Sequence, residues 1–165
     1  MVFLAPKQFK NLGPSGYLAY LLIKLEFTLK MYEGMRGHFK GQPPALDIIA
    51  REERDAISAL IRLQYVLGLS DATPYQEEGL NPDEPVERDH VIPIACMTQA
   101  ILEENIPEAR GNLFVRAWLS PVALISKASH LRIKNDLATC LPHQSEGLPF
   151  NRHFQKEIPL LRCGV

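Results

Sequence analysis

The chain has 165 residues, 46% apolar and 22% charged, which are ordinary proportions for a globular domain with a core of its own. Three scattered cysteines without a CxxC pair argue against a zinc ribbon or a disulfide framework, so the expected location is the reducing cytoplasm. The net charge is −1, but residues 47–108 carry −10 and residues 109–165 carry +5. This distribution excludes a uniformly basic nucleic-acid coat, while the basic C-terminal third suits a polyanionic partner.

The N-terminal part, residues 1–68, predicts a helical hairpin. A first helix is expected over residues 15–33, where Ser15 suits the N-cap and leucines recur at spacings of three and four. Three glycines and two prolines in residues 34–44 interrupt it, and a second helix is expected over about 46–67. The apolar run in the first helix is too short to span a bilayer, and no cleavage site follows it. The hairpin carries no chemical motif, so we expect it to form core.

The remaining chain predicts a little β-structure among further helices. Residues 69–87 contain three prolines and many acids and predict a long irregular connection. The elements expected after it are a strand at 88–94, a helix at 95–105 that Pro107 and Gly111 end, an ambiguous segment at 113–119, a strand at 120–126, a helix at 127–138 and an irregular tail at 139–165. We therefore expect one domain, residues 1–165, of the α+β class and mainly helical, with the hairpin packed on a small core at 86–138.

The stretch VERDHVIPI, residues 86–94, places Asp89 and His90 directly before an apolar run. Burying either group costs several kcal/mol unless it is paired or coordinated. Taken alone, the two residues are most simply a hydrogen-bonded pair at the end of a strand. The later strand-to-helix segment adds His130 one turn into its helix, with Lys127 and Lys134 close to it on the helix surface. The chain therefore has two groups of polar residues near the predicted strands: Asp89 and His90 in the first strand, and His130 with its two lysines in the helix after the second strand.

This order of elements resembles the ββα-metal motif of HNH endonucleases. In that family a strand carries DH, an apolar pair and often proline, as DHVIP does here, and a second strand runs into a helix whose histidine completes a single-metal site, as in LISKASHLRIK. The resemblance covers about residues 86–138. It implies that Asp89 and His130 bind one divalent ion and that His90 is the general base that activates water for attack on a phosphodiester. Asn112 is the nearest candidate for the asparagine that orients the base in this family.

The resemblance also implies an ion and a substrate. The expected ion is Mg²⁺ or Mn²⁺, with Ni²⁺ or Zn²⁺ as alternatives, and the expected substrate is nucleic acid, in the first place DNA. Lys127 and Lys134 suit contacts to phosphates beside the ion. In PFNRHF, residues 149–154, Arg152 is a further candidate for a phosphate contact, because its planar guanidinium binds oxyanions well. The alternative for this segment is that its two phenylalanines anchor the C-terminal tail to the core.

Two other classes of function stay open. One is a catalytically silent binding or accessory protein that uses the helical hairpin as its surface for a partner protein. The other is a metal-dependent hydrolase that uses the same aspartate and histidines on a substrate other than nucleic acid. The basic C-terminal third favours a polyphosphate substrate over a neutral one. The sequence leaves open the choice between DNA and RNA, any sequence specificity and the oligomeric state.

Overall fold

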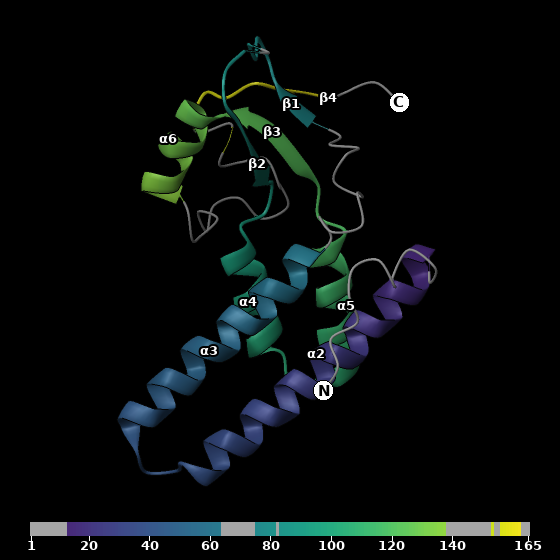
Figure 1. The fold of residues 1–165 in the computed structure, drawn as a ribbon, viewed down its shortest axis with the longest axis vertical. Coiled ribbons are helices and arrows are strands. Elements are labelled where there is room, and N and C mark those ends of the chain that lie inside the picture. Colours follow the sequence, from purple (N-terminus) through teal and green to yellow (C-terminus); the bar gives the residue numbers. More distant parts are fainter. Residues whose placement is uncertain (1–12, 64–74, 82, 138–152, 154–155, 163–165) are drawn as a thin grey trace. The chain divides into compact units, whose positions relative to one another are not determined.

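The structure, a computed structural model, describes residues 13–63, 75–81, 83–137, 153 and 156–162 (Figure 1). The chain divides into two compact units: residues 1–69 with 98–118, here called the helical unit, and residues 70–97 with 119–165, here called the sheet unit. The fold is α+β and mainly helical, as the sequence predicts. Each unit is described by itself, so the prediction of a single domain with the hairpin packed on the β-structure stays a prediction.

Two long helices form a hairpin in the helical unit, α2 (Gly13–His38) and α3 (Pro43–Arg62). The predicted hairpin is therefore present, but α2 continues five residues beyond the expected end. The break between the two helices is therefore shorter than the expected one at residues 34–44. Helix α2 runs through Gly34 and Gly37 because a glycine inside a helix lowers the stability of the helix by only about 1 kcal/mol. The turn falls at Gly41, whose φ of 89° is a conformation that glycine adopts without strain. Pro43 then opens α3, where the missing amide hydrogen of proline is no loss.

The remaining helices differ from the predicted pattern at one point. Helix α4 (Ile94–Glu103) matches the expected helix, and the boundary between the two units falls within it. Helix α4 ends before Pro107, as expected, but a further helix, α5 (Pro107–Trp118), begins at Pro107 and runs through Gly111, so Gly111 does not break the helical structure. Proline is favoured in the first turn of a helix, and the ambiguous segment at 113–119 is helical up to Trp118.

The core of the helical unit is made by one face of each of its long helices. On α2, Tyr17, Leu21 and Leu25 lie four residues apart and are buried. The ring of Trp118 meets the ring of Tyr17 edge to face, with centroids 6.3 Å apart. The other buried apolar residues of this core are Tyr32, Ile49, Ile57, Leu60, Ile61, Ile101, Phe114 and Ala117. Within the described residues, no helix is long and apolar enough to cross a membrane.

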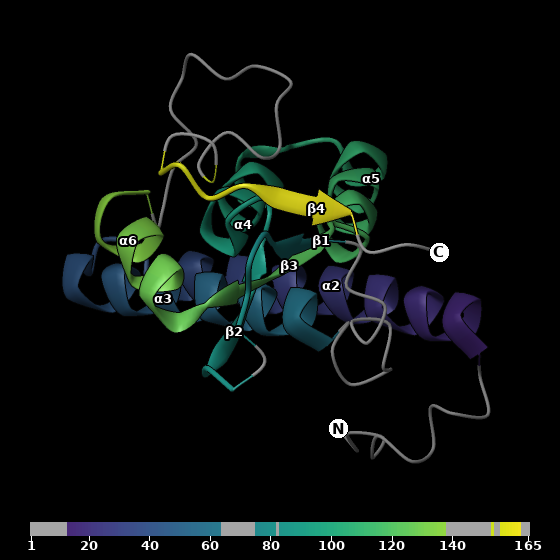
Figure 2. The ribbon, with the colours of Figure 1, turned by 90° about the horizontal axis from the view of Figure 1, so that it is seen from above.

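The sheet unit contains four short strands in the order β2-β3-β1-β4 (Figures 1 and 2). They are β1 (Tyr75–Glu77), β2 (Val86–His90), β3 (Val122–Ser126) and β4 (Leu160–Arg162). Strand β2 lies at one edge of the sheet and pairs antiparallel with β3, with Val86 opposite Ser126 and His90 opposite Val122. Two of the four strands thus overlap the strands expected at 88–94 and 120–126, and these two pair with each other. On its other side, β3 pairs with β1 in the parallel direction, and β4 pairs antiparallel with β1.

Strand β2 ends earlier than the sequence predicts, and α6 follows β3 without a linker. The predicted strand ran to residue 94, but the chain bends after His90 because Pro93 has no amide hydrogen for a sheet ladder. The carbonyl of Pro93 instead accepts the first amide hydrogens of α4. Helix α6 (Lys127–Leu137) packs against β2 and β3. The core beneath it contains Val91, Ala123, Ile125, Ile133 and Ile158, with Tyr75 and Leu160 at its edge.

Candidate functional site

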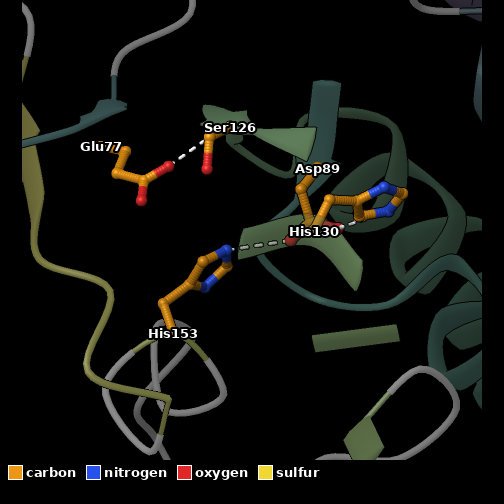
Figure 3. Close-up of polar contacts among 5 residues, drawn as sticks. All are labelled: Glu77, Asp89, Ser126, His130 and His153. Atoms are coloured by element: carbon orange, nitrogen blue, oxygen red, sulfur yellow. Dashed lines mark hydrogen bonds and ion pairs between the residues drawn. The ribbon is translucent and has the colours of Figure 1, made fainter. Parts of the chain in front are cut away.

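Asp89 lies where three segments of the sheet unit meet (Figure 3). It is the next-to-last residue of β2, opposite Ala123 in the ladder, and only 5% of it is exposed. The Nε2 atom of His130, on α6, is 3.9 Å from Oδ1 of Asp89. The Nε2 atom of His153, in the C-terminal segment, is 2.9 Å from Oδ2. The carboxylate therefore has one imidazole beside each of its oxygens.

The junction of β3 and α6 fixes the position of His130. Ser126 is the last residue of β3, and its hydroxyl accepts a hydrogen bond from the backbone N–H of Ser129 at 3.1 Å. This is an N-cap arrangement, and it starts α6 at the next residue. Since the register of β3 on β2 is also fixed, the helix brings His130 to Asp89 even though 41 residues separate them in sequence.

Asp89 and His130 are close enough to bind one ion. Two ligands that each lie about 2.1 Å from a metal ion are at most about 4.2 Å apart, and the two atoms here are 3.9 Å apart. The predicted approach of these two side chains is thus confirmed, while their role as ligands stays a prediction. In the part of the chain that the structure describes, no group of three or more histidine, cysteine, aspartate or glutamate side chains is arranged to hold a metal ion.

His90 occupies the last position of β2. It is 6% exposed, and its backbone pairs with Val122. Successive side chains of a strand point to opposite faces, so a regular strand directs His90 away from the face on which Asp89 meets α6. The chain bends at residues 91 and 92, directly after His90, so the regular strand ends at this residue. The role of general base stays a prediction for His90.

Of the other predicted site residues that the structure describes, only the two lysines lie on the same helix as His130. Lys127 is exposed at the first position of α6, in the same helix as His130. Lys134 lies in α6, where the structure describes its backbone only. Arg152 lies outside the described residues. Asn112 is an exposed residue of α5, in the helical unit, so the structure does not place it beside Asp89.

Two residues that the sequence did not indicate belong to the surroundings of this site. One is His153, which is only 1% exposed. The available signal was the place of this histidine between two phenylalanines in PFNRHF. In that segment, however, Arg152 was the only residue predicted to belong to the site. The other is Glu77, the last residue of β1, which lay in the segment expected to be irregular.

The carboxylate of Glu77 lies at the N-terminus of α6 (Figure 3). It accepts hydrogen bonds from the backbone N–H of Ser126 at 2.6 Å and from the hydroxyl of Ser129 at 2.5 Å. Burial acts to raise the pKa of Glu77, but these hydrogen bonds and the charge of Arg132 outweigh it, and the pKa lies below its ordinary value of 4.5. An anionic side chain of the protein therefore occupies the end of α6 at which a phosphate would otherwise be favoured.

Replacing Glu77 by alanine is expected to lower the free energy of unfolding by about 1.5–3 kcal/mol, the usual value of a hydrogen bond to a charged group. Because the pKa is lower in the folded state, the carboxylate stabilises the fold above pH 4.5, and this contribution is lost as the pH falls through the lowered value. Urea unfolding from pH 7 to pH 3 measures both effects. The exposed neighbour Glu78 is the matched control, and an equal loss in Glu78→Ala would contradict this account.

Compared with models of protein families, with curated proteins and with solved structures, the chain gives no match. The fold itself defines a mixed sheet in which β2 pairs antiparallel with β3 and β3 runs directly into α6. Asp89 of β2 and His130 of α6 lie close together at this junction.

Proposed function

We propose that the sheet unit is a metal-dependent nuclease site of the ββα-metal type, which hydrolyses phosphodiester bonds of nucleic acid, in the first place DNA. The observation that carries this proposal is the 3.9 Å separation of Asp89 Oδ1 and His130 Nε2. It is supported by the elements that bear them, an antiparallel pair followed at once by a helix. This is the arrangement that the resemblance of DHVIP and LISKASHLRIK to HNH endonucleases implies.

The donor atoms suit a divalent ion. Asp89 supplies an anionic oxygen, for which Mg²⁺ and Mn²⁺ have affinity, and His130 supplies a nitrogen that Mn²⁺, Ni²⁺ or Zn²⁺ also accepts. When bound, such an ion would neutralise the charge that develops on the phosphate and its leaving oxygen. The side chain of His130 is 31% exposed, so this ligand can be reached from solvent.

His90 is our proposed general base, and basic residues of the C-terminal third are the proposed phosphate contacts. An imidazole near neutral pH can take a proton from the water molecule that attacks phosphorus, while the bond to the leaving oxygen breaks. Lys127 is exposed beside this site on α6, and Lys134 and Arg152 are proposed to extend the basic surface. The proposed compartment is the cytoplasm, since the three cysteines suggest no disulfide framework.

A catalytically silent role is the second candidate, and one observation favours it. Asp89 and His153 are both almost fully buried and lie 2.9 Å apart. A buried acid–imidazole pair can simply hold the C-terminal segment on the sheet, as structural ion pairs do. On this alternative the protein keeps the ββα scaffold, binds a partner protein through the helical hairpin and cleaves nothing.

Cleavage of nucleic acid separates the two candidates. Supercoiled plasmid, single-stranded DNA and RNA are incubated with the protein and Mg²⁺, Mn²⁺ or Ni²⁺, and parallel samples contain EDTA. The nuclease proposal expects nicking or cleavage with at least one metal and none with EDTA. Absence of cleavage with every metal and substrate would favour the silent scaffold.

A further inference from the structure

Hydrogen bonds and core packing fix the position of His153 within the sheet unit. The backbone carbonyl of His153 accepts hydrogen bonds from the N–H groups of Lys156 and Ile158, at 3.1 and 2.9 Å. Ile158 is buried in the core beneath α6, and β4 follows it and pairs with β1. His153 is thus held by the fold at a fixed place above the end of β2.

The imidazole of His153 is buried without a well-aligned hydrogen bond. Its Nε2 atom lies 2.9 Å from Asp89 Oδ2, which is close enough for an ion pair, but neither ring nitrogen meets a hydrogen-bond acceptor with good geometry in the described part of the chain. Burying an imidazole in this way costs free energy that the fold must offset elsewhere. The group it faces is the carboxylate of Asp89, and Figure 3 shows the ring directed at that carboxylate.

We infer that His153 is a positioning residue for Asp89, an inference that rests on the proposed function. A carboxylate can turn about its last side-chain bond, so either oxygen could face an incoming ion. With Oδ2 held at His153, Oδ1 stays directed toward His130, where both can reach one ion. Residues that orient a metal ligand in this way contribute about 10–100-fold to metal affinity.

Replacing His153 by glutamine or by asparagine distinguishes a role in positioning Asp89 from a role in packing alone. The amide nitrogen of glutamine reaches about as far as Nε2 of histidine, whereas that of asparagine is shorter by one methylene and matches Nδ1. Mn²⁺ binding to the full chain is measured by electron paramagnetic resonance for wild type, His153→Gln, His153→Asn and His153→Ala. We expect His153→Gln to keep affinity near that of wild type and the other two to bind about 10–100-fold more weakly. Equal affinity in all four proteins would overturn the inference.

Thermal unfolding in EDTA shows which variants are folded, and only folded variants enter the comparison. If His153→Ala does not fold, the comparison of His153→Gln with His153→Asn decides the question. X-ray absorption of the Zn²⁺-loaded wild type then counts imidazole ligands. We expect one, from His130, and a count of two would overturn positioning by making His153 a ligand itself. Failure of the wild type to bind Mn²⁺ would overturn the proposed function as well, whereas equal binding by the variants overturns this inference alone.

Discussion

His90→Ala is expected to cleave nucleic acid about 10²–10⁴-fold more slowly than wild type, the usual contribution of a positioned acid–base group. Divalent-metal affinity should stay within a few-fold of wild type, because Asp89 and His130 hold the ion without His90. Single-turnover cleavage, together with Mn²⁺ titration on the same samples, measures the two properties separately.

The control for this substitution is His38→Ala, since His38 is an exposed histidine of α2 in the helical unit. It should cleave at the wild-type rate. If His90→Ala is fully active with every metal and substrate, His90 is a buried residue at the end of β2 and nothing more. That result would agree with the regular alternation of the strand, which directs its side chain away from the Asp89 face.

Asp89→Asn is expected to weaken divalent-metal binding by about 10²-fold or more, because the change removes the one anionic ligand while it keeps the size of the side chain. Cleavage should fall with metal occupancy, so an excess of Mn²⁺ should restore part of it. His90→Ala should show no such rescue. Calorimetric Mn²⁺ titration and cleavage at rising Mn²⁺ concentration measure this difference.

The matched control is Asp83→Asn, an exposed aspartate that precedes β2 in the same unit. Its metal affinity and its cleavage rate should equal those of wild type. An Asp89→Asn protein with wild-type metal affinity would rule out Asp89 as a ligand, and the contact with His153 would then be its main role.

The part of this fold that the sequence predicted depends on local signals. The apolar run that became β3 and the helix that follows it can be predicted without knowledge of the rest of the chain. Strand β2 (Val86–His90), in contrast, lies before the apolar run 91–94 on which its prediction depended. Strands β1 and β4 have three residues each, too few for a period-two pattern, and each is stabilised by partners distant in sequence. They therefore lay within segments expected to be irregular.

The same distinction applies to the candidate site. Asp89 and His130 were found because each lies at a recognisable point of a strand or helix. His153 was missed because its place depends on the burial of Ile158 and the pairing of β4, which no short stretch of sequence reveals. Asn112 was chosen by its distance along the chain, but α5 belongs to the helical unit, so that choice has no support from the fold.

The most direct test of the central claim is a crystal structure of the protein grown with Mn²⁺ and measured at a wavelength where manganese scatters anomalously. The account predicts an anomalous peak within about 2.0–2.3 Å of both Asp89 Oδ1 and His130 Nε2, with His153 on the other oxygen of the carboxylate. A Mn²⁺-loaded crystal without a peak between these two side chains would contradict it.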